Sequence, residues 1–491
     1  MEFRTRATWK NHSGNYSVEP LRLYRPNDLT ELTEIIAEAS RVDATVRAVG
    51  SHHSWSDAAL TFGFLVETHR LNRILALEPE LLTAAAQGRK LVRSEAGIRL
   101  RELNAHLDSV GLALSNMGGY DEQTVAGVMS TSTHGSGIGF GPLVSYVQSI
   151  ELIAADGGFY RIEPAAGITE AAAYRARYPE RRLVQDDQWF AAISVSMGCM
   201  GVIYAVTLEA EPSYWLKEVR TLSTWTKVRA ALESGILDAH RHYEVYFNPH
   251  PEKSGEHNCL VTTRNRVERP QGRTKGERYR RNWLVELGAR IVIIPKLLNL
   301  IFDLFPRSAP RLIDFSLKSL ADVEYTNKSY KVLNIGAANL LPAYSAEIGI
   351  PVDSRMLHIQ AVERIFAIAR QHATIGTVYH TAPVALRFVK ASNALLSMMS
   401  GSDTMMIELI LLHDTEGGFE LLASYEKELY ALGGRPHWGQ FNVLTGSNGL
   451  LAAMYPRLAE WQAVREQLDP RGRFDSPFSR RVGITRAEFT G

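Results

Sequence analysis

The chain has 491 residues, 45% of them hydrophobic, and its 54 Lys and Arg residues nearly balance its 53 Asp and Glu residues. That length predicts about two to four globular domains, and the net charge of +1 gives no overall field that would attract nucleic acid or an anionic membrane. Two cysteines exclude a disulfide framework and a cysteine-rich metal centre. The sequence shows neither a signal peptide nor an apolar stretch of membrane-spanning length, so we expect a cytoplasmic protein.

The first hundred or so residues alternate short strands and helices. A short strand over residues 21–24 is followed by Asp28, which caps a helix extending to Ala39 with its apolar side chains on one face. Residues 98–110 predict a second amphipathic helix, which Gly111 ends. This alternation indicates an α+β nucleotide-binding unit. Because the start of the chain lacks a G-x-G-x-x-G turn, we do not predict NAD.

Residues 49–56, V-G-S-H-H-S-W-S, form a loop after a strand over residues 45–49. Gly50 can adopt a positive φ and the serines leave room for a ligand, so successive backbone N–H groups can converge on a phosphate or pyrophosphate. Taken alone, such a loop is more often an ordinary turn. Two alternative interpretations of His52 and His53 are a pair of metal ligands and two solvated loop histidines. Adjacent side chains diverge on an extended chain and no further metal-ligand spacing is present, so we predict no metal site.

A second segment, residues 116–141, reads N-M-G-G-Y-D-E-Q-T-V-A-G-V-M-S-T-S-T-H-G-S-G-I-G-F-G. It is either a flexible linker or a wall of backbone and hydroxyl donors around a polar ligand. Residues 124–129 would bury well and a strand-forming sequence follows at once, which favours ligand binding. A third turn, M-G-C-M-G at residues 197–201, likewise leads into a strand.

In this order and spacing, the three segments resemble the FAD-binding domain of the vanillyl-alcohol oxidase family. The resemblance implies that the first loop holds the FAD pyrophosphate and that His53 is bonded to the flavin 8α-methyl, with His52 where the family has Gly. It further implies that Q-T-V-A-G and T-H-G-S-G contact the isoalloxazine and the diphosphate. Unlinked FAD stays an alternative, because the imidazole of His52 could shift the loop. The cofactor-binding residues expected on this basis are Gly50, Ser51, His52, His53, Ser54, Trp55, Gly118, Thr124, Gly127, Ser130, Thr131, Ser132, His134, Gly135, Gly137, Gly201 and, on the adenosine side, Ile203.

Residues 266–305 are first basic and then apolar, ending I-V-I-I-P-K-L-L-N-L-I-F-D-L-F. This stretch is either an amphipathic element at a membrane surface or a basic loop that leads into a buried helix. Pro295 and Asp303 interrupt the apolar run, which is too short to span a bilayer, so we favour the buried helix.

Four later segments resemble the C-terminal domain of the aldonolactone oxidase and alditol oxidase group, which includes L-gulonolactone oxidase and, more distantly, a covalent-flavin cholesterol oxidase. They are Y-T-N-K-S-Y-K-V-L from Tyr325, E-I-G-I-P from Glu347, P-V-A-L-R-F from Pro383 and R-P-H-W-G-Q from Arg435. The resemblance implies an α+β fold: a two-subdomain FAD-binding domain of the PCMH type at residues 1–210 and an α+β substrate (cap) domain with an antiparallel sheet at residues 211–455. Residues 456–491 would return to the FAD domain.

Within this resemblance, Arg387 matches the family's active-site arginine, with a surface ion pair as the alternative. The glutamate common two residues earlier is Ala385 here, and the lysine that commonly follows H-W-G is Gln440. Gln440 can still donate a hydrogen bond, but two charges are missing from the expected pocket. A pocket with fewer polar groups favours a less hydroxylated substrate.

Two further residues are candidates for acid–base chemistry. Glu408, in M-M-I-E-L-I, is the candidate for a relocated carboxylate, although on an alternating strand it could equally face water. His437 is the other candidate acid or base, unless it and Trp438 form a packed structural motif.

Together these features predict an FAD-dependent oxidoreductase that transfers a hydride from a CH–OH group to flavin N5, with a sugar lactone or alditol as substrate and O2 as acceptor. The alternatives are an oxidase of a less polar alcohol or biosynthetic intermediate, a dehydrogenase that passes electrons to a quinone or cytochrome at a membrane surface, and a protein that binds FAD without turnover.

Overall fold

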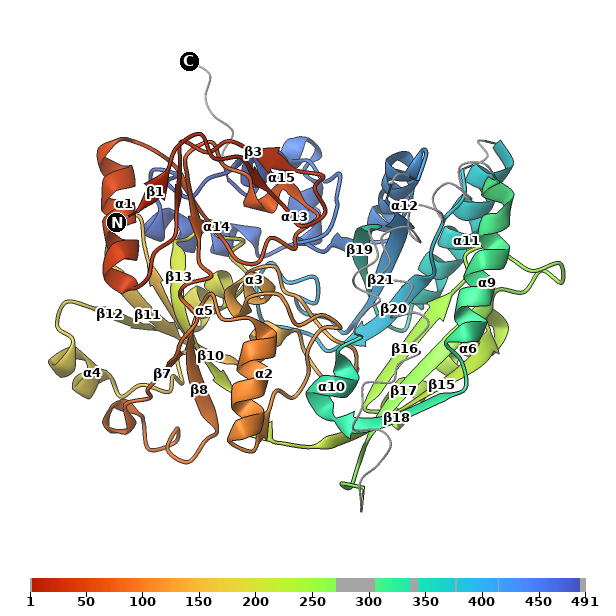
Figure 1. The fold of residues 1–491 in the computed structure, drawn as a ribbon, viewed down its shortest axis with the longest axis horizontal. Coiled ribbons are helices and arrows are strands. Elements are labelled where there is room, and N and C mark those ends of the chain that lie inside the picture. Colours follow the sequence, from red (N-terminus) through yellow and green to blue (C-terminus); the bar gives the residue numbers. More distant parts are fainter. Residues whose placement is uncertain (1, 271–304, 336–342, 376–377, 414, 486–491) are drawn as a thin grey trace.

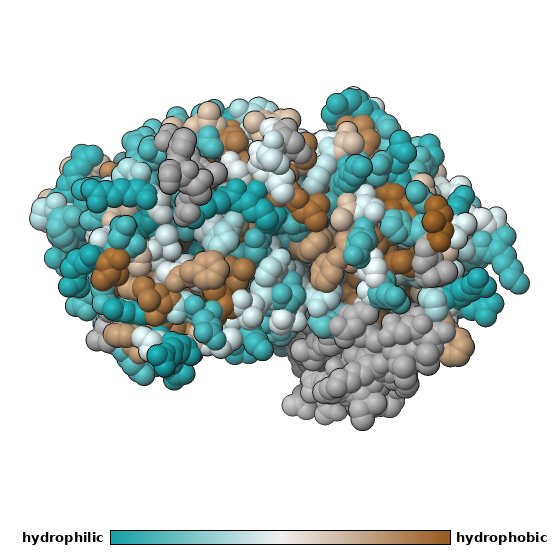
Figure 2. Space-filling model, turned by 90° about the horizontal axis from the view of Figure 1, so that it is seen from above, coloured by the Kyte–Doolittle hydropathy of each residue, from teal (hydrophilic) through white to brown (hydrophobic). Residues whose placement is uncertain are grey.

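A computed structural model describes residues 2–270, 305–335, 343–375, 378–413 and 415–485. The basic and apolar stretch predicted over residues 266–305 lies outside this part of the chain, except at its first five residues and its last. Within the described part, no helix combines the length and the apolar character needed to cross a membrane. The face seen from above is hydrophilic over much of its area, with hydrophobic residues in smaller patches (Figure 2).

The first sheet of the N-terminal half has four strands, in the order β1-β4-β6-β5, of which β4, β6 and β5 run parallel. Helix α1 packs on it through Leu32, Ile35 and Ile36, and Asp28 caps this helix as predicted by accepting from the Glu31 N–H. The bounds are β1 Phe3–Arg4, β4 Arg22–Tyr24, α1 Leu29–Arg41, β5 Val46–Val49 and β6 Phe64–Glu67, with a small hairpin of β2 Trp9–Lys10 and β3 Ser17–Val18.

The second sheet has six strands, in the order β12-β11-β10-β13-β8-β7. Helices α3 and α5 pack against it, and α2 ends before Gly111, whose φ of +74° fits the predicted helix stop. The strands are β7 Ile74–Leu75, β8 Leu91–Glu95, β10 Val147–Ile153, β11 Phe159–Glu163, β12 Arg182–Gln185 and β13 Val202–Glu209. The helices are α2 Leu100–Ser109, α3 Val125–Ser130, α4 Ala171–Arg177 and α5 Asp187–Ser194, and the short strands β9 Leu112–Ala113 and β14 Glu211–Pro212 pair with each other.

The cap half is built on one eight-stranded sheet in which every neighbouring pair is antiparallel, in the order β18-β15-β17-β16-β20-β21-β19-β22 (Figure 1). The α+β fold with an antiparallel cap sheet is therefore confirmed. The strands are β15 Trp215–Thr224, β16 His242–Phe247, β17 Asn258–Val267, β18 Val323–Lys328, β19 Ala343–Pro351, β20 Val384–Val389, β21 Thr404–Leu412 and β22 Arg435–Pro436.

Helices divide the cap sheet into two faces. Trp225 and Phe366 pack on Phe247, so α6 and α11 cover the face turned away from the N-terminal half. Leu317 of α9 packs on Leu260 of β17, on the opposite face, and both side chains line the cavity described below. The helices are α6 Trp225–Glu233, α9 Ala309–Ser319, α10 Ser329–Leu333, α11 Leu357–Ile375 and α12 Gly418–Ala431.

The C-terminal residues pack on the N-terminal half. Helix α14 lies against α5, the Ala155 N–H donates to Leu468 O, and the Val46 N–H donates to Arg473 O. The helices here are α13 Leu450–Met454, α14 Leu458–Leu468 and α15 Pro477–Val482. These contacts bring the described residues 456–485 against the N-terminal half, as the proposed return of residues 456–491 to the FAD-binding domain requires.

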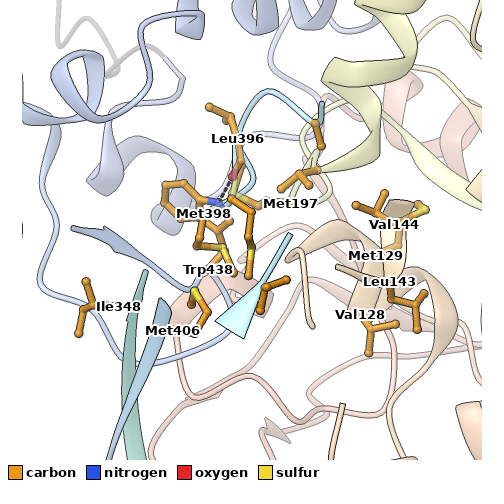
Figure 3. Packing of buried hydrophobic residues seen from close by; sticks show 14 of the residues in the cluster. Val128, Met129, Leu143, Val144, Met197, Ile348, Leu396, Met398, Met406 and Trp438 are labelled. Atoms are coloured by element: carbon orange, nitrogen blue, oxygen red, sulfur yellow. Dashed lines mark hydrogen bonds between the residues drawn. The ribbon is translucent and has the colours of Figure 1, made fainter. Parts of the chain in front are cut away.

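One hydrophobic core runs through both halves and contains Trp438, which is fully buried. The indole lies beside Met398 and donates from Nε1 to Leu396 O at 2.6 Å, while Met406 of β21 and Met197 of the third glycine-rich turn lie near it (Figure 3). This packing holds the turn that follows β22, and with it His437 and Gln440, against the end of the cap sheet.

Candidate active site

A cavity of about 550 Å³ is lined by both halves of the molecule. Its N-terminal wall comes from the loop after β5, the glycine-rich segment around α3, and the turn before β13. Its other wall comes from the cap sheet, α9 and the turn after β22. The three segments singled out in the sequence therefore meet at one site.

The loop after β5 presents a row of unused donors. Among the described residues, the backbone N–H groups of residues 50–54 have no acceptor, and the loop closes where the Trp55 N–H donates to Gly439 O. Gly50 is needed for close approach, because a Cβ there would lie 2.1 Å from Thr124 Oγ1. The positive φ that Gly50 can adopt occurs instead at His52, with φ of +65°. There Trp9 Nε1 donates to the imidazole and the His12 N–H donates to His52 O.

His53 lies in the same loop between two aromatic rings, His12 at 4.3 Å and Tyr120 at 4.7 Å. Its Nε2 is 3.4 Å from the Tyr120 hydroxyl, which leaves Nδ1 for another partner. Burial, with the nearby His12 and His52, lowers the pKa of His53 to about 3. The imidazole is therefore neutral at pH 7, as it must be to form a bond to carbon.

The second wall surrounds the start of α3, where the Thr124 hydroxyl accepts from the Gly127 N–H. Three predicted cofactor residues lie elsewhere. Ser132 bonds to Ser397, Gly135 packs on Asn116, and the Gly137 N–H donates to Phe388 O. The remaining predicted residues line the cavity: Gly50, Ser51, His52, His53, Ser54, Trp55, Gly118, Thr124, Gly127, Ser130, Thr131, His134, Gly201 and Ile203.

This donor set fits FAD. A dinucleotide diphosphate needs converging N–H and hydroxyl donors and close backbone approach. The loop after β5 supplies the unused N–H groups and the close backbone approach, and Thr124 at the start of α3 supplies a hydroxyl. The loop, with Thr124, Ser130 and Thr131, would hold the cofactor along this wall. The polar groups of the cap sheet line the same cavity, where they would be available to the isoalloxazine or to a substrate.

On the cap sheet, Arg387 of β20 and Glu408 of β21 form an ion pair, with Nη1 2.6 Å from Oε2. Both side chains are about nine-tenths buried and line the cavity, so Glu408 does not face open water. Glu408 stands directly across from Ala385 in the strand register. Burial alone would lower the pKa of Arg387, but the carboxylates of Glu408 and Glu347, with Tyr246, raise it well above its usual value.

Glu347 of β19 joins three groups of the site. Its Oε1 lies 3.3 Å from His134 Nε2 and 3.5 Å from Arg387 Nη1, and its carbonyl accepts from the His437 N–H. Burial opposes ionisation of this carboxyl, but His134, His437 and Arg387 outweigh burial and lower its pKa to about 2. Glu347 is therefore an anion that ties the T-H-G-S-G segment to the cap sheet.

His134, Glu347 and His437 lie close enough to be considered as metal ligands. However, His437 Nδ1 accepts from the Gly439 N–H, which places the imidazole proton on Nε2, and burial lowers the pKa of His437 to about 4. An Nε2–H donates and does not ligate a cation. Arg387 also already faces the Glu347 carboxylate. The geometry fits a hydrogen-bonded ion-pair cluster better than a metal site.

Gln440 lies where a lysine was expected, and its side chain lines the cavity. Its amide oxygen is buried and has no hydrogen-bond partner among the described residues. A buried amide without a partner is unfavourable, so a ligand that donates a hydrogen bond here would be stabilised.

Sequence reasoning missed three residues of the site: Arg47, Glu347 and Tyr120, all of which line the cavity. Arg47 and Glu347 each lie in a strand whose neighbouring residues are mostly apolar, and a charge inside a buried strand was the available signal. Tyr120 carried no such signal.

Known proteins are similar to this chain over almost its whole length. Residues 206–482, more than half of the chain, match the family described as D-arabinono-1,4-lactone oxidase, and residues 20–163 match an FAD binding domain. L-gulonolactone oxidase of Mus musculus is 27% identical over 96% of this chain and 98% of its own length. L-gulono-1,4-lactone dehydrogenase of Mycobacterium tuberculosis and alditol oxidase of a Streptomyces species are each 28% identical over 96% of this chain, covering 98% and 97% of their own lengths.

Solved structures show the same fold. Cholesterol oxidase from B. sterolicum superposes with a TM-score of 0.75 over 98% of this chain and 97% of that one, at 14% identity. The resemblance predicted from the motifs is confirmed. The chain belongs to the D-arabinono-1,4-lactone oxidase family, as an enzyme built on an FAD-binding domain.

Proposed function

We propose that this enzyme oxidises a CH–OH group of a sugar lactone or alditol by hydride transfer to flavin N5, with O2 as electron acceptor. The observation that carries the proposal is the Arg387–Glu408 pair, which faces the predicted cofactor loop across one cavity. FAD, when bound, supplies the hydride acceptor.

The chain's own groups would then position the substrate and manage its proton. Arg387 provides a fixed positive charge that Glu408 and Glu347 orient. Glu408 Oε2 binds Arg387, so Oε1 is our candidate to accept the substrate hydroxyl proton. His437, as an Nε2–H donor, and Gln440 would hydrogen-bond to substrate or cofactor, and His53 would carry the 8α bond through Nδ1.

Anaerobic reduction of the flavin tests the reaction directly. The purified enzyme is mixed without oxygen with L-gulono-1,4-lactone, xylitol and sorbitol, and the loss of visible flavin absorbance is followed. Bleaching by at least one of these compounds is expected. No bleaching by any polyol, lactone, sterol or aliphatic alcohol would contradict the proposal and leave a protein that binds FAD without turnover.

The acceptor needs its own measurement, because one of the similar proteins is named a dehydrogenase. If O2 is the acceptor, peroxide should form in step with substrate consumption. Turnover that requires an added quinone or cytochrome c, with little peroxide, would instead support the dehydrogenase alternative.

An apolar arm of the cavity favours a second candidate substrate class. We define this arm as Leu260, Leu317, Leu320, Ile410 and Leu412, all of which line the cavity. Leu260 lies on β17, two strands from Arg387 on β20, which places it about 10 Å away across the sheet, farther than a lactone ring reaches. An alcohol with an apolar tail would fill this arm, as the uncharged Gln440 in place of the expected lysine also suggests.

A variant with a larger side chain in the apolar arm distinguishes sugar lactones and alditols from alcohols with an apolar tail. A Leu317→Trp variant should lower kcat/KM for long-chain or sterol alcohols about tenfold and leave short alditols nearly unchanged, because only a tail reaches this side chain. Equal effects on both kinds of substrate would count against the second candidate.

A further inference from the structure

Arg47 of β5 is a buried cation on the cofactor side of the cavity. It is 3% exposed and lines the cavity next to the loop of residues 50–54. Its Nε donates to Ala58 O at 2.6 Å, and Nη1 lies 3.9 Å from Cys199 Sγ, a weak contact. No carboxylate in the described part of the chain lies within ion-pair distance of this guanidinium.

The other buried arginines in the described part of the chain each have a carboxylate partner. Arg161 pairs with Glu151 and Glu163, and Arg264 pairs with Glu218 and Glu244. Arg465 and Arg473 likewise have Asp475 and Asp43. A charge removed from water without a counter-ion is strongly unfavourable, which is why buried arginines are usually paired. Arg47 is the exception.

The surroundings of Arg47 indicate what its partner is. Its strand leads directly into residues 50–54, whose backbone N–H groups have no acceptor among the described residues. On the other side stands Gly198, with φ of +72°, where a Cβ would lie 3.1 Å from Arg47 Nη1. Backbone donors and a guanidinium that line the same wall match an anion with several oxygens.

We propose that Arg47 is the counter-ion of the FAD diphosphate, so that this cation opposes folding of the apoprotein and favours binding of the dinucleotide. The inference depends on FAD as cofactor and not on the identity of the substrate. It predicts opposite effects of one substitution: removal of the charge should stabilise the protein without cofactor and weaken its hold on FAD.

The test uses apoprotein from riboflavin-limited cells, in a His53→Ala background that prevents covalent attachment. Binding of FAD, ADP and adenosine is measured by calorimetry, together with the Tm of the apoprotein. In Arg47→Met, FAD and ADP should each bind at least tenfold more weakly, adenosine binding should stay within twofold, and the apoprotein Tm should rise by a few degrees. Arg47→Lys should keep much of the ADP affinity without raising the Tm.

Arg161→Met is the matched control, because it removes a buried arginine that already has carboxylate partners. This variant should lower the apoprotein Tm and leave ADP affinity unchanged. The proposal is overturned if Arg47→Met lowers the apoprotein Tm with ADP affinity intact. Arg47 would then have a purely structural role, as the donor of the hydrogen bond to Ala58 O. Equal weakening of adenosine and ADP would overturn it too, since that would place Arg47 on the nucleoside.

Discussion

At the scale of single residues, the most informative feature is a carboxylate that lies on β21 and not, as the resemblance predicts, on the neighbouring strand β20. Ala385 stands where the resemblance leads us to expect glutamate, and Glu408 lies directly opposite it in the register of β20 and β21. Side chains directly opposite on antiparallel strands share a face and lie within about 5.5 Å at Cβ. The acid therefore returns to the same cavity beside the same Arg387.

This arrangement predicts that a carboxylate restored at position 385 recovers activity lost at position 408. Glu408→Ala should lower kcat/KM about a hundredfold, because it removes the proposed proton acceptor and leaves Arg387 with one carboxylate neighbour fewer. Adding Ala385→Glu in the same chain should recover about tenfold of that loss. Steady-state kinetics with the substrate that bleaches the flavin measure both effects.

Glu460→Ala on α14 is the matched control, since it removes an exposed glutamate that also pairs with an arginine. It should leave kcat/KM unchanged. If Glu408→Ala behaves like this control, or if Ala385→Glu depresses activity further, Glu408 does not serve as the relocated carboxylate.

A second residue-scale prediction concerns His53. Wild-type protein precipitated with acid should keep its yellow colour in the pellet, whereas His53→Ala should release all flavin into the supernatant, because the neutral imidazole of His53 is the group proposed to form the 8α bond. A matched His12→Ala variant keeps His53 and should retain the colour in the pellet. Free flavin from the wild-type protein would rule out the covalent bond.

At the scale of elements, local patterns were enough to predict α1, α2, the three glycine-rich turns, the strand before the first turn and the strands after the other two, because capping, periodicity and turn chemistry are local. The pairing of Glu408 with Arg387 was not predictable in this way. It depends on which residues of β19, β20 and β21 stand opposite one another, and antiparallel register is fixed by contacts far apart in the chain. Glu347 went unrecognised for the same reason.

The loop after β5 gives an element-scale prediction. His52 holds the positive φ that a glycine would adopt without strain, at a cost of about 1 kcal/mol. His52→Gly should therefore change the free energy of unfolding by no more than about 1 kcal/mol, since relief of strain offsets the lost contacts with Trp9 and Glu67. Flavin content per chain should stay at the wild-type value. Denaturant unfolding and the visible absorbance ratio measure both.

Gly50→Ala is the contrasting variant at the same loop. Its Cβ would lie 2.1 Å from Thr124 Oγ1, so the loop has to move away from α3 and flavin content should fall sharply. If His52→Gly loses flavin as completely as Gly50→Ala, the imidazole itself supports the cofactor loop and the strain argument is wrong.

At the scale of the whole molecule, buried histidines make stability depend on pH. Burial lowers the pKa of His242 and His380 to about 3, and the pKa of His250 and His437 to about 4. The unfolded chain binds a proton at each of these groups near pH 6.5, whereas the folded chain does not until pH 3 to 4. Their contribution is therefore complete above pH 6.5 and is lost as the pH falls toward 4.

Each of these histidines should then lower the free energy of unfolding by about 2 kcal/mol between pH 6.5 and pH 5. His380 isolates the effect, because both of its ring nitrogens are buried without a hydrogen-bond partner among the described residues. His380→Leu should be close to the wild type in stability at pH 7.5 and should lose about 2 kcal/mol less on acidification to pH 5, as followed by denaturant unfolding at each pH. Parallel losses in the two proteins would mean that His380 gains its proton equally in both states, and the acid sensitivity would then have to come from other groups.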